Sequence, residues 1–367
     1  MYDFDLIIFL IAVNIGFLIL VFILFAYIII NKYLNNRRET YKNIFFHGLE
    51  EAFMSLLVQG RSGDAVRVVN SIKQSDYEIF IEFISIYLTN IKGADFDKII
   101  DVLYKSTLFK NLCDSIRASN VDAKLYSIYC LGLMKKPVSI NDLLFAMHDG
   151  NPFVRMAAIK AIAEIGFIDV LEEVLIALDS ESYITEYKLS EILWSFGEEI
   201  CPKLLRIFEK SDTKIIKIDR PSLLTSALIE IFGYWKYFAS AEIIHEILRK
   251  TDIDLIRKSC LYSLGKMVHV GAINDVVKCL ESKNSLVRLN AVNAMLELRA
   301  IDKIEKIKPL LNDADWNVRY ATASALFAMN FDFQAYMFSS ELASEELSKA
   351  YRTIVHVLTE KLTPGAG

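Results

Sequence analysis

A sequence pattern that recurs at a fixed interval is the strongest constraint on the fold of this chain. Arg257, Arg288 and Arg319 follow one another at intervals of 31 residues, and an aliphatic residue precedes each of them. Each arginine is followed by a small residue two to four positions later and by a large apolar residue seven positions later. A period in this range is typical of a solenoid, in which each pair of helices packs only on its neighbours. The sequence therefore predicts an all-α solenoid of helical hairpins.

The same pattern extends towards the N-terminus with decreasing fidelity. Arg155 repeats it, and Lys124 stands 31 residues earlier. Two further copies lack the arginine, and we expect them to be centred on Thr185 and Leu224. The interval between these two is 39 residues, and the extra length falls in the charged stretch 209–220, which predicts a loop insertion on one face of the solenoid. Seven copies result, at positions 124, 155, 185, 224, 257, 288 and 319.

Two segments carry a resemblance to a known family. Residues 149–162 (DGNPFVRMAAIKAI) and 313–326 (DADWNVRYATASAL) are similar to HEAT repeats of the bacterial, phycobilisome-lyase-like kind. The resemblance covers residues 121–330, and it implies an array of the kind that serves mostly as a scaffold or adaptor. Because a fold does not fix a function, the resemblance specifies architecture more strongly than activity.

The recurrent residues themselves are expected to serve the structure. Asp149 and Asp315 can accept the free N–H groups that open the first helix of a repeat. The arginines are placed to reach acidic or carbonyl groups of the next turn, which would form a ladder along the stack. Small residues such as Ala158, Ala291 and Ala294 allow helices of adjacent repeats to approach closely. None of these residues is expected to form a functional site.

The N-terminal part of the chain predicts a membrane anchor. Residues 6–30 contain no charged side chain, and about 20 apolar residues suffice to cross a bilayer. The stretch has no basic region before it and no small-residue cleavage site after it, so we expect it to be retained rather than cleaved as a signal peptide. Acidic residues precede it and basic residues follow it, which predicts an N-terminus outside the cell and a cytoplasmic solenoid in a single-pass protein of the cell membrane. The basic residues are Lys32, Arg37, Arg38 and Lys42.

These observations divide the chain into four expected segments. Residues 1–42 form the transmembrane anchor and a basic juxtamembrane segment, and residues 43–120 form a helical N-terminal part of the solenoid. Residues 121–330 form the HEAT-like array, and residues 331–367 form a C-terminal cap and tail. The sequence leaves open whether the membrane helix continues to Val58 or bends near Asn35 and Asn36.

Composition and motifs argue against several functional classes. The formal charge of −5 lacks the basic surplus of a protein that grips phosphate backbones, so no nucleic acid is expected. The five cysteines are widely spaced and predict buried free thiols. No phosphate-binding loop, activated serine or zinc-protease motif occurs. His245–Glu246 is the single adjacent pair of its kind, where helical-repeat hydroxylases use several, and we expect it to lie on a solvated helix. We therefore predict no enzyme, no metal, no cofactor and no small-molecule substrate.

Two places are candidates for partner binding. The aromatic residues Tyr234, Trp235, Tyr237 and Phe238 fall at the turn between two helices beside the insertion, and such residues are favoured anchors in interfaces. The alternative is that the rings cover the gap that the insertion leaves. Within the apolar stretch, Asn14 can hydrogen-bond to another transmembrane helix, and Gly16 allows close approach. The alternative there is a tolerated polar residue without a role.

Three functional hypotheses follow. The first is a non-catalytic, membrane-anchored scaffold that binds a protein partner at the cytoplasmic face. The second is an accessory subunit of a membrane-embedded enzyme complex, such as an envelope polysaccharide synthase, whose multi-span partner would contact Asn14 and Gly16. The third is an enzyme of the lyase or hydroxylase kind built on the same repeats.

Overall fold

The computed structural model of the chain describes residues 2–181, 183–210, 215–333, 336 and 344–362. These residues form 19 α-helices and eight short 3-10 helices, and no β-strand occurs among them. The all-α solenoid that the sequence predicts is therefore confirmed. Two compact units make up the chain, Met1–Ala161 (unit 1) and Ile162–Gly367 (unit 2).

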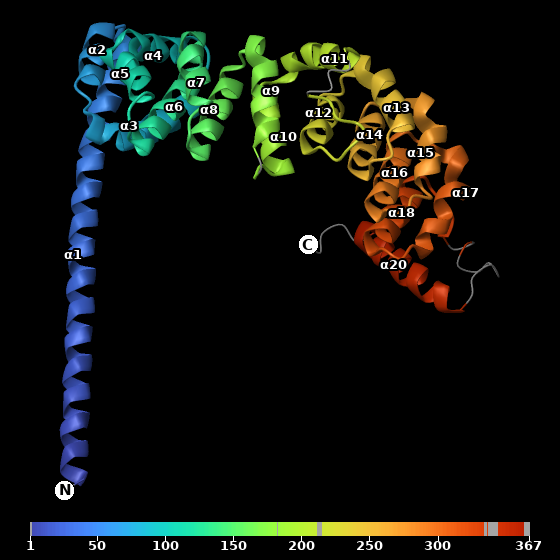
Figure 1. Ribbon diagram of the computed structural model, residues 1–367, viewed down its shortest axis with the longest axis horizontal. Helices are drawn as coiled ribbons and strands as arrows, with labels where there is room; N and C mark the ends of the chain where they lie inside the picture. The colour runs from blue at the N-terminus through green and yellow to red at the C-terminus, as the bar shows by residue number, and fades with distance from the viewer. Residues whose placement is uncertain (1, 182, 211–214, 334–335, 337–343, 363–367) are drawn as a thin grey trace. The chain divides into compact units, whose positions relative to one another are not determined.

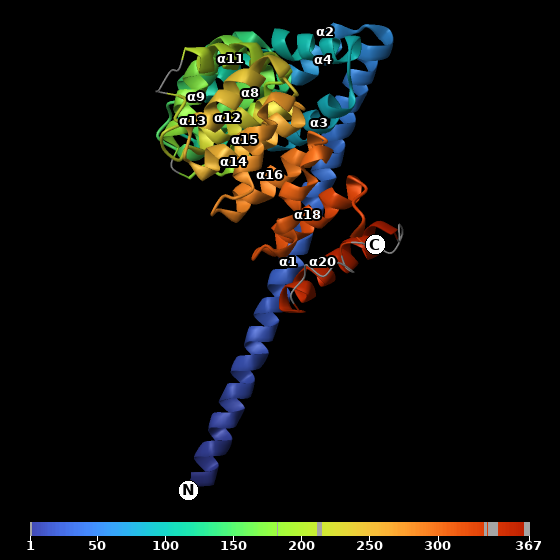
Figure 2. The same ribbon diagram turned by 90° about the vertical axis from the view of Figure 1, so that its right-hand side faces the viewer.

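Helix α1 (Tyr2–Gln59) is continuous over 58 residues and does not bend at Asn35 and Asn36. At a rise of about 1.5 Å per residue it is about 87 Å long. Figures 1 and 2 both show it extending well beyond the other helices of unit 1. Its apolar residues from Val13 to Ile30 are largely exposed, whereas Leu49, Phe53 and Leu56 near its C-terminal end are buried against the following helices. Among the described residues, one helix is therefore long and apolar enough to cross a membrane.

The other helices of unit 1 pack on α1 and on one another. Helices α2, α3 and α4 pack on the C-terminal part of α1, and α5 packs on α6. Their common core contains the fully buried rings of Phe53, Phe80 and Phe83. The helices are α2 (Ser62–Asn70), α3 (Tyr77–Asn90), α4 (Ala94–Lys105), α5 (Thr107–Ser115), α6 (Val121–Met134), α7 (Ile140–Ala146) and α8 (Pro152–Ile165), the last of which continues into unit 2.

Unit 2 has two layers of helices, which follow each other alternately along the chain. Successive members of the first layer contact one another from α10 through to α20 (Ser344–Leu362), and Figure 1 shows the second layer beside them. The first layer contains α10 (Glu186–Ser195), α12 (Leu223–Tyr234), α14 (Asp254–Lys266), α16 (Ser285–Glu297) and α18 (Trp316–Ala328). The second contains α9 (Leu171–Ser180), α11 (Cys201–Glu209), α13 (Ala241–Lys250), α15 (Ile273–Cys279) and α17 (Ile304–Ile307).

One backbone feature marks every turn between the two helices of a repeat. At each of these turns a single residue has a positive φ, which lets the chain leave the first helix; a 3-10 turn that opens the second helix follows six of the seven residues, and the seventh, Asn330, lies at the end of α18. Two of the seven residues are glycines, for which this conformation carries no steric penalty. The others bear side chains. In order they are Lys135, Gly166, Gly197, Lys236, Val268, Arg299 and Asn330.

Close packing between successive first-layer helices relies on small residues, as the sequence predicts. Ala158, Ala291 and Ala294 are all buried. A Cβ atom at Gly265 would lie 3.0 Å from the Cα of Ala294, and one at Gly233 would lie 2.6 Å from the Cα of Ser263. Neither position leaves room for a side chain, so these glycines set the separation of α12, α14 and α16.

The arginines stand at one register position in the first-layer helices. Arg257, Arg288 and Arg319 each lie four residues after the helix cap, and Lys124 and Arg155 occupy the same position in α6 and α8. Each arginine donates to carbonyls of the turn before its own helix, as Nη1 of Arg319 does to Asp313 (2.7 Å) and Arg155 does to Asp149 (2.9 Å).

The predicted ladder between repeats forms at two places. The guanidinium of Arg288 binds both carboxylate oxygens of Asp313 in the next turn, at 2.6 and 2.8 Å. The ammonium of Lys124 binds Asp149 at 2.5 Å in the same way, 25 residues further along the chain. Asp315 caps α18 as predicted. Asp149 instead accepts from the N–H of Asn151, and Asn151 is the residue that caps α8.

The two copies without an arginine are placed incorrectly by the sequence analysis. Thr185 is the cap of α10, where its side chain accepts from the N–H of Lys188. The position equivalent to the arginines is therefore Leu189, four residues later. In α12 the cap is Ser222, and the equivalent position is Ser226 rather than Leu224. Both copies lack the arginine that marks the register of the other repeats, so the sequence pattern alone did not determine their register.

Candidate functional site

The aromatic residues predicted to bind a partner lie at the end of α12, with different exposures. Tyr234 is 48% exposed and stacks on Trp194 of α10, with 4.9 Å between the ring centroids. Trp235 is half-buried and meets Tyr234 edge to face. Tyr237 is also half-buried and stacks on the buried ring of Phe232, whereas Phe238 is 66% exposed. Two of the four predicted rings thus cover the core, and Tyr234 and Phe238 face solvent.

The exposed aromatic residues continue into a row of apolar side chains in the following repeats. Phe238, Val270 and Ile301 are each the first residue of the 3-10 turn that opens a second-layer helix, and they are 66%, 60% and 58% exposed. Val268, which has a positive φ, is 50% exposed in the same turn as Val270. We call these four residues together with Tyr234 the apolar turn edge. The sequence analysis found only its first repeat.

A second set of exposed apolar residues lies at the starts of first-layer helices. Tyr187, Leu286 and Trp316 are 75%, 55% and 44% exposed there. They stand in the first turn of their helices, at the opposite ends of the first-layer helices from the apolar turn edge. This second set provides a matched comparison for any test of the apolar turn edge.

The insertion before α12 packs against the solenoid in the part that the structure describes. Ile215 and Ile216 are buried, and the N–H of Lys217 donates to Thr225 of α12 at 2.9 Å. The hydroxyl of Thr251 donates to the carbonyl of Ile218 at 2.8 Å. Residues 211–214 of the predicted insertion lie outside the described residues. Residues 215–218 thus fill space between repeats.

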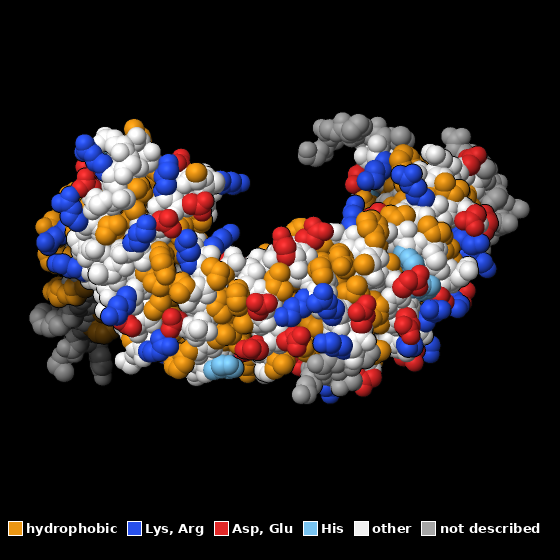
Figure 3. Space-filling view, turned by 90° about the horizontal axis from the view of Figure 1, so that it is seen from above, with side chains coloured by type: hydrophobic (Ala, Val, Ile, Leu, Met, Phe, Trp, Pro, Cys, Tyr) orange, Lys and Arg blue, Asp and Glu red, His pale blue; other side chains and the backbone are white. Residues whose placement is uncertain are grey.

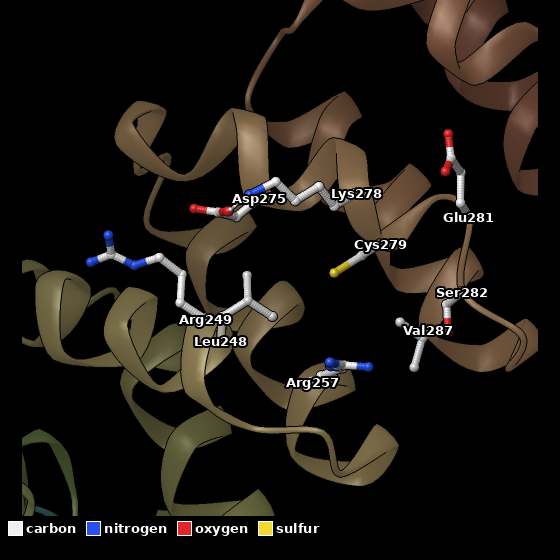
Figure 4. Close-up of a pocket in the computed structure, with 9 residues that line it drawn as sticks. All are labelled: Leu248, Arg249, Arg257, Asp275, Lys278, Cys279, Glu281, Ser282 and Val287. Atoms are coloured by element: carbon white, nitrogen blue, oxygen red, sulfur yellow. Dashed lines mark hydrogen bonds and ion pairs between the residues drawn. The ribbon is translucent and has the colours of Figure 1, made fainter.

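A hollow of about 440 Å³ lies between α13, α14 and α15 (Figure 4). Asp275 and Lys278 of α15 lie together on one side of it, 2.7 Å apart, and Cys279 points towards its interior. The Lys278 ammonium, followed by the His245 ring, lowers the pKa of the Asp275 carboxyl below its usual value. Arg257 lines the hollow but is held by the carbonyl of Thr251. Asp275 is therefore ionised at neutral pH, and Glu281 is a second acidic residue that lines the hollow.

Next to this hollow, two histidines and a carboxylate meet between consecutive repeats. One donor atom from each of Glu242, His245 and His269 lies within 4.8 Å of the other two. His245 is buried, and its Nε2 atom lies 2.8 Å from Oδ2 of Asp275. The solvated position expected for His245–Glu246 is therefore wrong for His245, because residues 241, 244, 245 and 248 form the buried stripe of α13. Glu246 is exposed and pairs with Lys250.

The two predicted contact residues of the apolar stretch lie on different sides of α1. Asn14 and Gly16 are both exposed, and a Cβ atom at Gly16 would meet nothing within 4 Å. Two residues along an α-helix correspond to a rotation of about 200°, so the side chains point in nearly opposite directions. One neighbouring helix would therefore contact either Asn14 or Gly16, but not both.

Two of the four basic residues after the apolar stretch have partners within unit 1. Arg38 pairs with Glu78 at 2.9 Å, and Lys42 pairs with Glu82 at 2.5 Å. Both acids belong to α3. These contacts fix the C-terminal part of α1 to the unit, and they leave less of the basic cluster for anionic lipid.

The thiols do not form a nucleophilic centre. All five cysteines are free, and Cys130, Cys201 and Cys260 are buried. Burial raises the pKa of Cys201 to about 12, and burial together with Asp142 raises that of Cys113 to about 12. A thiol with a raised pKa is protonated at neutral pH and is a poor nucleophile. The prediction of buried free thiols is confirmed for these three cysteines.

Charges of both signs are interspersed on the face shown in Figure 3, with hydrophobic side chains between them. That face has no broad basic area among the described residues. Proteins that bind the phosphate backbone of nucleic acids use clustered Lys and Arg side chains. Neither the face in Figure 3 nor the net charge of −5 provides such a basic surplus.

The geometry defines a class of protein, the α-solenoid of stacked helix pairs. Residues 241–327 match the family model of HEAT repeats, so this part of the α-solenoid consists of HEAT repeats. HEAT repeats generally mediate protein–protein interactions. A comparison with curated proteins gave no match.

The comparison with solved structures found both engineered and natural proteins. An engineered protein is 14% identical over 88% of this chain and 95% of its own, with a TM-score of 0.36. The complex of CpcE and CpcF of phycocyanin lyase from Nostoc sp. is 15% identical over 68% and 94%, with a TM-score of 0.29. Human deoxyhypusine hydroxylase in complex with glycerol is 16% identical over 78% and 97%, with a TM-score of 0.31. These likenesses concern the fold alone.

Proposed function

We propose that this protein is a non-catalytic scaffold of the bacterial type, anchored in the cell membrane by residues 6–30, which binds a protein partner through the apolar turn edge. The N-terminus lies outside and the chain after the apolar stretch lies in the cytoplasm, because basic residues follow that stretch. No nucleic acid, cofactor or small-molecule substrate takes part. The continuity of α1 supports the anchor, since the apolar stretch and the buried residues Leu49, Phe53 and Leu56 belong to the same helix.

The backbone of Val268 is the observation that carries the docking proposal. Its φ of 52° is unfavourable for an L-residue and more so for a β-branched one. Glycine occupies the same position in two other repeats, at Gly166 and Gly197. Val268 is nevertheless 50% exposed, so its side chain adds little to the core. An apolar side chain held in a strained conformation at the surface is a sign of a functional contact.

The charge of the edge sets the kind of partner. Apolar side chains at Phe238, Val270 and Ile301 alternate with the cationic Lys236 and Arg299, which occupy the position of Val268 in the neighbouring repeats. A partner that buries this edge would therefore present an apolar strip flanked by acidic side chains. Its core contacts would be apolar and its rim charged, as in most protein interfaces.

Site-specific photocrosslinking in the native membrane tests this proposal. A photoreactive residue at Val270 is expected to form a covalent adduct with a protein, and a Phe238→Ser/Ile301→Ser variant is expected to lose that adduct. A photoreactive residue at Leu286, in the second exposed set, serves as the control. The docking proposal fails if Leu286 gives the same adduct, or if the serine substitutions leave the Val270 adduct unchanged.

The second candidate, an accessory subunit of a membrane-embedded enzyme complex, rests on the exposed Asn14 within the apolar stretch. A polar side chain at this depth can hydrogen-bond to a neighbouring transmembrane helix. A photoreactive residue at position 14 that crosslinks to a multi-span protein would favour this candidate. Crosslinking at Val270 to a soluble protein, with none at position 14, would favour the first.

A further inference from the structure

We propose that Glu242, His245 and His269 form a binding site for a divalent transition-metal ion, with Zn²⁺ as the best fit, and that this ion joins two consecutive repeats. The site goes beyond the docking function and is independent of it. The sequence analysis predicts no metal, because it considered the adjacent pair His245–Glu246 and not residues that meet across repeats.

The separations between the donor atoms are close to those of a bound ion. Ligand atoms about 2.0–2.2 Å from a tetrahedral Zn²⁺ lie roughly 3.4 Å apart. Nε2 of His269 lies 3.6 Å from Oε1 of Glu242, and the three donor atoms lie within 4.8 Å of one another. The side chain of Glu242 is 83% exposed, so it can rotate to shorten the remaining distances without disturbing the core.

His269 supplies a second, independent observation. Its Nε2 atom is buried and has no hydrogen-bond partner within the described residues. A buried polar atom of this kind normally has a partner, and a metal ion is one possible partner for an imidazole nitrogen. A Cβ atom at Gly271 would lie 3.1 Å from this Nε2 atom. The glycine therefore keeps open the space beside the nitrogen.

His245 is oriented from behind by a carboxylate. Its Nε2 atom is held by Asp275, so the ion would be bound by the second ring nitrogen. Histidine ligands commonly donate their other ring N–H to a carboxylate in this way, which fixes the ring and strengthens its basicity. Lys278, which is 77% exposed, pairs with Asp275 at 2.7 Å and so neutralises the outer carboxylate from the solvent side.

The donor set selects the class of metal. Two imidazoles and one carboxylate suit Zn²⁺ and its first-row neighbours, whereas Ca²⁺ and Mg²⁺ prefer oxygen ligands throughout. Three protein ligands leave a fourth position for water. Glu242 and His245 belong to α13, and His269 belongs to the turn before α15, so the ion would hold together the second helix of one repeat and the turn of the next.

Metal titration of the purified full-length chain in detergent tests the site. After treatment with a chelator, the chain is expected to bind one equivalent of Zn²⁺ by calorimetry and to give the visible absorption of tetrahedral Co²⁺. His269→Ala and Gly271→Ala are each expected to weaken Zn²⁺ binding at least tenfold. Gly271→Ala removes no ligand and only fills the space beside Nε2, so its effect would be specific to the geometry.

Glu246→Gln is the matched control, because Glu246 lies on the same helix and pairs with Lys250 outside the cluster. Its Zn²⁺ affinity is expected to equal that of the unmodified chain. Asp275→Asn is expected to weaken binding by about 10- to 100-fold through the orientation of His245. The proposal is overturned if the chain binds no Zn²⁺, or if His269→Ala and Gly271→Ala bind it as tightly as Glu246→Gln does.

Discussion

The ion pair between Arg288 and Asp313 allows a quantitative test of what holds successive repeats together. Two nitrogens of Arg288 bind the two carboxylate oxygens of Asp313 at 2.6 and 2.8 Å, and the side chains are only 15% and 5% exposed. Oδ1 of Asp313 also accepts the N–H of Asp315 at 2.8 Å. The substitution Asp313→Asn removes the negative charge but keeps an acceptor for that N–H, so it isolates the contribution of the pair.

The expected loss follows from the burial of the pair. Removing one partner of a fully buried ion pair costs about 3–5 kcal/mol, because the other charge is left without compensation. Arg288 would keep its bonds to the carbonyls of Ser282 and Lys283, at 2.7 and 3.0 Å. We therefore expect a smaller loss of about 2 kcal/mol, which corresponds to an increase of roughly 30-fold in the opening equilibrium of α16 and α18.

Hydrogen exchange of the backbone amides measures this opening directly. Repeat proteins open locally, so exchange in α16 and α18 is more informative than a single unfolding midpoint. Glu246→Gln, which breaks the exposed pair with Lys250, serves as the control and is expected to leave exchange in α13 nearly unchanged. If Asp313→Asn accelerates exchange no more than the control does, the stacked ion pair does not stabilise the array and our reasoning is refuted.

Three further substitutions test other parts of the structure. Val268→Gly relieves the positive φ of 52° and is expected to stabilise unit 2 by about 1 kcal/mol, measured as a higher melting temperature, while weakening partner crosslinking. Gly233→Ala places a Cβ atom 2.6 Å from the Cα of Ser263 and is expected to destabilise by about 2–3 kcal/mol, whereas Gly48→Ala, with nothing within 4 Å, should not destabilise. The ammonium of Lys124, followed by the backbone N–H of Asn151, holds the pKa of Asp149 below its usual value. Ionised Asp149 therefore stabilises unit 1 above the unfolded-state pKa of about 3.9. This stabilisation is lost as the pH falls through the lower folded-state pKa. Acid unfolding followed by circular dichroism should therefore be less steep in Asp149→Asn, and an identical acid profile would contradict this.

The accuracy of the sequence analysis depended on which side chain marked each repeat. Arg257, Arg288 and Arg319 were located at the correct helical register because each binds carbonyls of its own turn, a role that requires an arginine at a fixed distance from the cap. In α10 and α12 that role is absent, and only the caps Thr185 and Ser222 remain. Capping residues are common in loops, so they did not stand out.

The histidine cluster was missed for a related reason. Glu242 and His245 lie three residues apart and so share one face of α13, which the sequence does show. The third donor, His269, comes from the turn of the next repeat, and its distance from α13 depends on the register between the repeats. The exposed apolar turn edge was likewise found only where aromatic residues made it conspicuous, at Tyr234 and Phe238, because Val270 and Ile301 are ordinary core residues by type.

The unbroken course of α1 has a mechanical consequence for a protein that is held in a bilayer. Arg38 and Lys42 pair with α3 about 12 and 18 Å beyond residue 30, at a rise of about 1.5 Å per residue, and Leu49, Phe53 and Leu56 of the same helix are buried. The other helices of unit 1 are therefore attached to the apolar stretch by a continuous helix and not by a flexible linker. In the membrane-anchored protein proposed above, the tilt of these helices would follow that of the apolar stretch, and a binding partner that diffuses along the membrane would meet them in a nearly constant orientation. Much of the rotational freedom that two soluble proteins lose on association would already be lost before they meet.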